Sequence, residues 1–132
     1  MIQEGLFARL AADAGVLALV GGNIFAGAAP DDLSLYPCAS YTFVGGSDAV
    51  TFSGKHETRS RVELNGHALT YAAAAKIRLA IIKALDGWAA TLTDGTVVTA
   101  TTLINPGLDF VGEDRIFRHL VEFYVDFNPP TS

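Results

Sequence analysis

Residues 61–88 read RVELNGHALTYAAAAKIRLAIIKALDGW, and they decide the fold because they hold a strand followed by a capped helix. Thr70 precedes a run of good helix formers, where a threonine side chain accepts a hydrogen bond from a free backbone N–H. Gly87 stands where a glycine ends a helix. We predict a helix from Tyr71 to Asp86. Its buried stripe consists of Ile77, Ile81, Ala84, Leu85 and Trp88.

Two strands are predicted before this helix, and both alternate between two faces. Cys38–Val44 has Ala39, Tyr41 and Phe43 on one face. Arg59–Gly66 points Ser60, Val62 and Leu64 inward, and Arg59, Arg61, Glu63 and Asn65 outward. This alternation is typical of an antiparallel sheet with one buried face and one wet face. Between the two strands, GGSDAVTFSGKHET (residues 45–58) is too long and polar for a tight turn, which predicts a long hairpin arm.

Beyond the helix, the sequence predicts a hairpin and a closing strand. Asp94-Gly95 favours a type I′ turn before a strand at Thr96–Leu103, and Pro106-Gly107 favours a second turn. The last strand lies in IFRHLVEFYVDF, residues 116–127. One of its faces carries Phe117, His119, Val121, Phe123, Val125 and Phe127, and the other carries Ile116, Arg118, Leu120, Glu122, Tyr124 and Asp126.

The N-terminal third adds a helix, a short second helical turn and a brief strand. A helix is predicted over Ile2–Asp13, with Ile2, Leu6, Phe7, Leu10 and Ala14 on its apolar face. Val16–Val20 follows and is ended by glycines; a strand is predicted over Asn23–Ala28 and a loop over Asp31–Tyr36. Helices and strands do not alternate regularly. We therefore expect one α+β domain over residues 1–132, a mainly antiparallel sheet with two principal helices packed on one face.

Composition excludes several classes of function. Half of the residues are hydrophobic, so a real core is expected, and the formal charge of −5 argues against a nucleic-acid-binding surface. The apolar runs are shorter than the ~20 residues that span a bilayer. Gln3 and Glu4 stand where a secretory signal has basic residues. These features predict no membrane segment and a cytosolic chain.

No motif in the chain carries recognisable chemistry, so we expect neither an enzyme nor a cofactor. The stretch FSGKHE (residues 52–57) lacks the first glycine and the Ser or Thr that a P-loop requires. Cys38 is the only cysteine, and we interpret it as a small buried residue. His67 falls in a predicted loop and His119 at the rim of the core, where one ring nitrogen would find a partner at the sheet edge. A zinc site formed by the three histidines is the less favoured alternative.

The basic cluster Lys55, His56, Arg59 and Arg61 offers two interpretations. It could contact phosphates, or it could be a solvated arm in which Glu57 and Glu63 are interleaved. We favour the solvated arm, because a nucleic-acid footprint usually dominates the charge of its domain.

The order of these segments resembles the siphophage tail-terminator family, also called tail completion or tail-to-head joining proteins. Ala18–Phe25 and then Pro30 are similar to the family's opening turn and proline, and YPCASYTF (residues 36–43) is similar to its first long strand. Residues 61–88 resemble its strand, capped helix and closing segment, and FRHLVEFYVDF (residues 117–127) resembles its last strand. The resemblance covers residues 1–127.

The resemblance implies assembly without catalysis. Members form a hexameric ring that docks on the last ring of the tail tube, stops its polymerisation and presents a surface to the neck of the capsid. The implied partners are other copies of the chain, the tail tube protein and a head-completion or neck protein. The chain would be made in the host cytoplasm and reside in the virion at the tail–head junction. DNA would pass through the lumen, and an acidic chain suits passage without adhesion.

Two surfaces are candidates for these contacts. Arg118, Leu120, Glu122 and Tyr124 mix apolar anchors with charge, which suits a subunit interface. A mobile arm would contact the tube or the neck through Asp48, Lys55, His56, Glu57 and Arg59. The alternatives are another head–tail adaptor of a phage or prophage, or a small ligand-binding domain or enzyme.

Overall fold

The computed structural model describes residues 2–30, 32–50, 56–111 and 116–128. In chain order its elements are α1 (Ile2–Ala12), α2 (Ala14–Val20), β1 (Ile24–Ala26), a 3₁₀ turn (Leu33–Leu35), β2 (Cys38–Val50), β3 (His56–Ala68), α3 (Tyr71–Leu85), β4 (Ala90–Thr91), β5 (Val97–Val111) and β6 (Phe117–Asn128). None of the described helices is both long and apolar enough to cross a bilayer.

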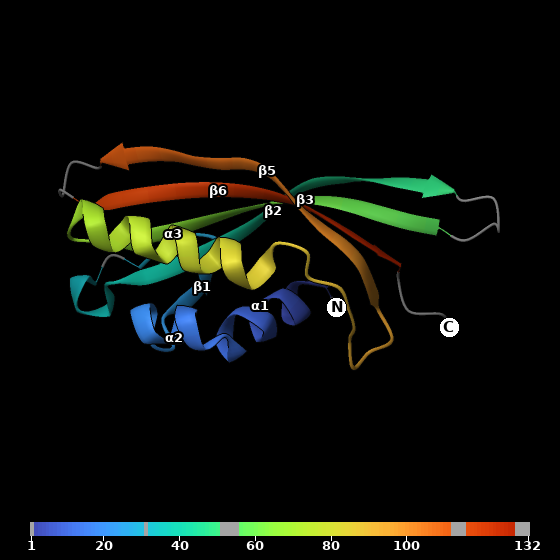
Figure 1. The fold of residues 1–132 in the computed structure, drawn as a ribbon, viewed down its shortest axis with the longest axis horizontal. Helices are drawn as coiled ribbons and strands as arrows, with labels where there is room; N and C mark the ends of the chain where they lie inside the picture. The colour runs from blue at the N-terminus through green and yellow to red at the C-terminus, as the bar shows by residue number, and fades with distance from the viewer. Residues whose placement is uncertain (1, 31, 51–55, 112–115, 129–132) are drawn as a thin grey trace.

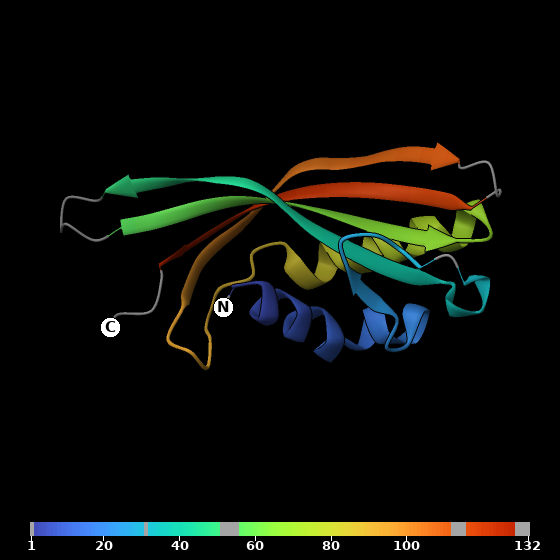
Figure 2. The ribbon, with the colours of Figure 1, turned by 180° about the vertical axis from the view of Figure 1, so that it is seen from behind.

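The strands form one six-stranded sheet in the order β1-β2-β3-β6-β5-β4. Only β1 and β2 are parallel, and the other neighbours are antiparallel. All three helices lie on one side of this twisted sheet, and the other side carries no helix (Figures 1 and 2). The α+β fold predicted from the sequence is confirmed, with α1 and α3 as the two longer helices and α2 as a third, short one.

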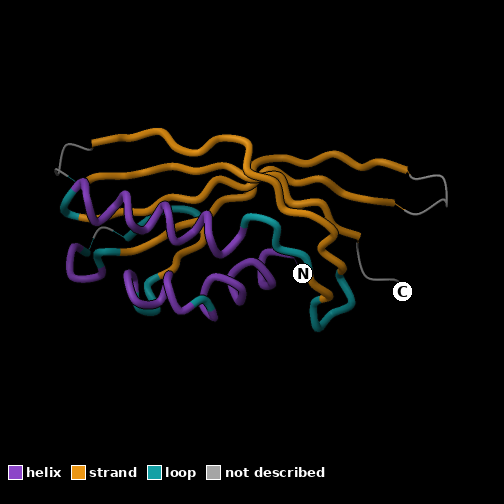
Figure 3. Tube along the Cα trace, viewed as in Figure 1, coloured by secondary structure: helices purple, strands orange, loops and turns teal. Residues whose placement is uncertain are grey.

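The main helix, α3, has the predicted caps and the predicted buried stripe. The Thr70 side chain accepts a hydrogen bond of 3.2 Å from the Ala73 N–H. Gly87 follows the helix with a φ of 76°, a conformation that glycine adopts without strain. The five predicted stripe residues are buried, and so is Ala74. Figure 3 shows α3 running beneath the sheet along its strands.

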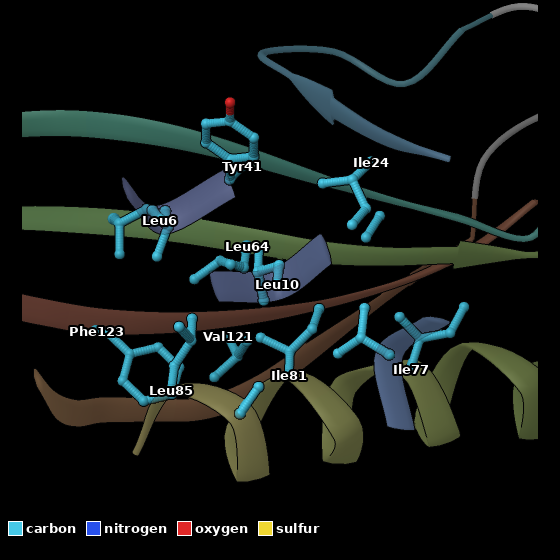
Figure 4. Close-up of a cluster of buried hydrophobic side chains, with 14 of the residues drawn as sticks. Leu6, Leu10, Ile24, Tyr41, Leu64, Ile77, Ile81, Leu85, Val121 and Phe123 are labelled. Carbon is cyan, nitrogen blue, oxygen red and sulfur yellow. The ribbon is translucent and has the colours of Figure 1, made fainter. Parts of the chain in front are cut away.

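The core fills the space between the helices and the sheet (Figure 4). Leu6 and Leu10 enter it from α1, Leu64 from β3, and Phe123 from β6. Gly66 lets α3 approach β3 closely, because a Cβ atom at this position would lie 2.7 Å from Cγ2 of Ile77.

The first helix departs from its prediction in two respects. Ile2, Leu6 and Leu10 are buried, but Phe7 is 39% exposed. The buried stripe of α1 is a narrow i, i+4 row, and Phe7 lies beside it. Ala14 is also exposed, because α1 ends at Ala12 and the Asp13 carboxylate caps α2 by accepting a hydrogen bond of 3.0 Å from the Val16 N–H.

Several strands are longer than predicted. The ladder between β2 and β3 reaches from Cys38↔His67 to Val50↔His56, so the hairpin arm extends the sheet. β5 continues through Pro106-Gly107, where a turn was predicted. The registers of β5 and β6 shift at three places between Val98 and Leu108, which marks β-bulges rather than a chain reversal. A fourth bulge lies between Phe43 and Gly46 of β2.

The turn between β4 and β5 is shifted by one residue from its predicted position. The Gly95 N–H donates to the Leu92 carbonyl at 3.0 Å, so Thr93 and Asp94 are the central residues of the turn. Gly95 follows with a φ of 94°. This is the three-residue hairpin with a glycine bulge, and not the type I′ turn predicted at Asp94-Gly95.

Candidate interaction face of the sheet

The helix-free side of β3 and β6, here called the outer face, gathers the residues predicted for a subunit interface. Along both strands the core residues alternate with residues that point away from the helices. The outer face consists of Arg59, Arg61, Glu63, Asn65 and His67 of β3, paired with Asp126, Tyr124, Glu122, Leu120 and Arg118 of β6. The four predicted interface residues therefore share one surface.

Arg59 and Asp126 form the strongest ion pair of this face. Nε of Arg59 donates to Oδ1 of Asp126 at 2.7 Å, and a terminal guanidinium nitrogen donates to Oδ2 at 3.1 Å. The guanidinium carbon also lies 4.8 Å from the centre of the Tyr124 ring. Arg59 was predicted as an arm residue, but its side chain binds two residues of β6 on the sheet. This geometry holds Tyr124 in place.

Arg61 is shared between two carboxylates. Its Nε lies 3.4 Å from Oε2 of Glu122, and a terminal nitrogen lies 3.7 Å from Oε1 of Glu63. The side chains of Arg61 and Glu63 are 42% and 31% exposed, so these contacts are largely solvated. Two carboxylates with one guanidinium leave this part of the outer face with net negative charge.

The outer face is more covered than a wet face was expected to be. Leu120 is 8% exposed and Asn65, predicted to point into solvent, is 7% exposed. Tyr124 is only half-buried, so in the isolated chain it offers a larger accessible apolar surface than Leu120 does.

His67 lies within β3 and not in a loop as predicted. It is buried, and its Nε2 lies 2.8 Å from the Ser40 hydroxyl oxygen of β2. Burial, and secondarily the positive charge of Arg118, lower the pKa of His67 to about 4. The imidazole is therefore neutral at physiological pH.

His119 is not at the rim of the core or at a sheet edge, as the sequence predicted. It lies in β6, between β3 and β5, with 1% of its surface exposed. Its ring meets that of Tyr71 edge-on, with the centres 4.7 Å apart. His67 and His119 occupy opposite faces of the sheet. Among the described residues, no three His, Cys, Asp or Glu side chains gather as a metal site would require.

Cys38 is fully buried at the start of β2, as a small core residue would be. Desolvation raises the pKa of its thiol to about 11. Because the thiolate is the nucleophilic form, this environment opposes nucleophilic chemistry.

The predicted arm residues fall into three groups. The backbones of Asp48, His56 and Glu57 belong to the β2–β3 ladder. Arg59 lies on the outer face. Lys55 lies outside the described residues.

Among the described residues, two hollows on the helix side of the molecule were not revealed by the sequence. One, of about 450 Å³, lies between α1 and the β4 hairpin and includes Trp88. The other, of about 750 Å³, lies between α2 and α3 and includes Leu79, Lys76 and Lys83. A signal was available for the second, because Leu79 falls outside the buried stripe of α3 and is 56% exposed.

Comparisons with known proteins match a family model and 26 chains of solved structures. The model of the family described as "Tail completion protein gp17" matches residues 4–125. A chain of a solved structure entitled "Virion of native gene transfer agent (GTA) particle" has the same fold, with a TM-score of 0.68 and 16% sequence identity. That match covers 94% of this chain and 92% of the other. No curated protein matches the chain.

Proposed function

The chain belongs to the family of tail completion protein gp17, and from this premise we propose that it caps the tail tube as a ring, ends tail polymerisation and provides the joint to the head. The observation that carries the proposal is the extent of the family match, which runs from α1 to β6. The family consists of structural proteins of the virion, and this chain is a tail structural protein.

The proposed ring is a hexamer in which the outer face contributes to the contact between copies. Central apolar anchors surrounded by paired charges are typical of protein interfaces. Here Leu120 and Tyr124 are flanked by Arg59, Arg61 and Glu122. A contact between two different patches of identical chains repeats in one direction, and it closes into a ring when its rotation permits.

The proposed partners are the tail tube protein on one side of the ring and a head-completion or neck protein on the other. The chain would therefore reside at the tail–head junction of a phage or of a phage-like particle, with DNA passing through the lumen. Contact with the tube or neck through the arm residues Asp48, Lys55, His56 and Glu57 is part of the same proposal. Strong amide-exchange protection at the arm tip in a free monomer would contradict an arm that orders on contact.

Deletion of the gene tests the function directly. We expect particles without the protein to have tails beyond normal length, or tails that do not join heads, in negative-stain images. Unjoined tails of normal length would favour a head–tail adaptor. Normal, infectious particles would contradict both roles.

The double substitution Leu120→Asp with Tyr124→Asp tests the interface. Added carboxylates beside Glu122 and Asp126 would repel, and the apolar contacts would be lost. We expect a variant that does not restore the deletion mutant. Leu120 is 8% exposed, so Tyr124→Asp alone, at a half-buried position, separates loss of the interface from unfolding: this single variant should stay folded, as measured by circular dichroism, and still fail to restore the deletion mutant. Phe7→Asp with Leu17→Asp is the matched control, because both residues are 39% exposed on the helix side. A double variant that terminates tails normally would exclude the outer face as the interface.

A further inference from the structure

A groove between α2 and α3 forms an apolar surface with charged margins on the helix side. Its lining consists of Asp13, Gly15, Ala18, Leu19, Lys76, Leu79, Ala80, Ile82 and Lys83. Leu79 is 56% exposed within it, whereas its helix neighbours Ile77 and Ile81 are buried. An exposed leucine in a concave apolar surface is typical of an interaction site.

The charge of the groove differs from that of the whole chain. The formal charge of the chain is −5, yet the groove holds Lys76 and Lys83, two of the three lysines in the sequence. Asp13 lies at the α2 side of the groove. Such a surface favours an apolar partner surface with net negative charge, and it offers one carboxylate to a cation.

The outer face has the complementary chemistry. It presents the half-buried Tyr124 next to Glu63 and Glu122, which share the single guanidinium of Arg61. The guanidinium of Arg59 on the Tyr124 ring is paired with Asp126, so the carboxylates around Tyr124 exceed the cations by one. An aromatic side chain beside excess negative charge matches an apolar groove flanked by lysines.

The two surfaces also lie on opposite sides of the molecule. The groove is formed by helices, all of which lie on one side of the sheet, and the outer face is the other side (Figures 1 and 2). Two complementary patches on opposite sides of a subunit generate a head-to-tail contact that repeats from copy to copy.

We propose that the α2–α3 groove receives the outer face of β3 and β6 from a second copy of this chain. Tyr124 packs against Leu79 across the contact, and Lys76 and Lys83 approach Glu63 and Glu122. The inference rests on the proposed ring and specifies the second surface, which a head-to-tail ring requires.

The first test compares two leucines on the helix side. Leu79→Glu places a carboxylate in the groove, and Leu17→Glu places one on an exposed part of α2 outside it. In the gene-deletion background, Leu79→Glu is expected to give the titre of the deletion, and Leu17→Glu that of the wild type. A wild-type titre for Leu79→Glu overturns the inference.

The second test identifies the occupant by disulfide cross-linking. The chain with Leu79→Cys and Tyr124→Cys is oxidised in assembled particles or, where none form, as the purified chain at high concentration. Cys38 is fully buried and stays outside the reaction. We expect a ladder of cross-linked copies on a non-reducing gel. Chains with only one of the two introduced cysteines should stay monomeric.

Other gel patterns overturn the inference. Dimers from a single-cysteine chain would mean that like surfaces meet. Absence of the ladder, or cross-links only to another particle protein, would mean that the groove does not hold a second copy. The gene deletion keeps the two claims separate: a tail defect in the deletion together with a normal Leu79→Glu titre leaves the proposed function intact and removes this inference alone.

Discussion

The two faces of β3 and β6 differ although they belong to the same strands. On the helix side, Val62 and Leu64 are fully buried, whereas Arg61 and Glu63, which alternate with them on the outer face, have side chains 42% and 31% exposed. Alternate residues of one strand therefore serve different purposes. The inner face supplies most of the folding free energy through apolar burial, and the outer face holds paired charges that contribute less to stability. Substitutions on the two faces should therefore differ in how much they lower the free energy of unfolding.

The largest effect is expected at Leu85, on the inner side. Leu85→Ala removes fully buried methyl groups between α3 and the sheet and should lower the free energy of unfolding by about 2–5 kcal/mol. Leu69→Ala is the control, because Leu69 is 54% exposed. Chemical denaturation measures both. A loss below about 1 kcal/mol for Leu85→Ala, the level of a surface substitution, would mean that this face does not carry the core.

The second effect concerns the close approach of α3 to β3. Gly66→Ala places a methyl group 2.7 Å from Cγ2 of Ile77 and 3.1 Å from the Ala74 carbonyl oxygen, so the helix must shift. We expect a loss of about 1–3 kcal/mol, the usual cost of overpacking. Gly22→Ala is the matched control, since nothing lies within 4 Å of its added methyl group. Equal thermal midpoints for the two variants would show that the helix does not rest on Gly66.

On the outer face, His67 predicts a dependence of stability on pH. Its folded pKa of about 4 lies below the ordinary value of 6.5, so between these pH values the unfolded chain binds more protons. The folded state therefore loses stability as pH falls from 6.5 towards 4. The loss should be on the order of 1–2 kcal/mol at pH 5. His67→Gln removes this titration, and denaturation at pH 7 and pH 5 should show a smaller difference in the variant. An unchanged difference would contradict the buried neutral imidazole.

The smallest effect is expected for the ion pairs of the outer face. Asp126→Asn weakens the two hydrogen bonds from Arg59 to a side chain that is 11% exposed, and should cost about 1 kcal/mol. Glu63→Gln loses only a contact of 3.7 Å at the surface, and should change stability by less than about 0.5 kcal/mol. Urea titrations of both variants give the comparison. A cost for Asp126→Asn as large as that for Leu85→Ala would remove the distinction between the faces.

Local signals made the main helix predictable. Thr70, the stripe from Ile77 to Leu85 and Gly87 lie within one continuous segment, and each acts through neighbours in the sequence. The inner faces of β3 and β6 were predictable for the same reason, because alternation with a period of two is a local property.

Three of the failed predictions depend on partners far away in the sequence. Pro106-Gly107 has turn chemistry, but pairing with β6 keeps the chain extended and absorbs the extra residues as bulges. The place of His119 depends on strand order, which puts β6 between β3 and β5. Asn65 is buried between its cross-strand neighbours Leu120 of β6 and Ser40 of β2, which the strand order places beside it.

The candidate surfaces also differ in whether local sequence or long-range contacts define them. The four interface residues of β6 could be grouped from the sequence, because they share one side of a strand. Their partners Arg59 and Arg61 required the register between β3 and β6. The groove required the packing of α2 on α3, and only the unburied Leu79 indicated it in advance.

The bulges of β5 have a consequence for how the isolated chain behaves in solution. Among the described residues, β1 pairs with Ala39–Tyr41 of β2 and β4 pairs with Val97–Val98 of β5, so the rest of the outer edge of each long strand has no described strand beside it. Straight open edges template the addition of further strands, which leads to fibrils. The three bulges of β5 break its edge into short pieces, and Pro106 lacks an N–H to donate. We therefore expect the open edge of β5 to be a poor template for added strands.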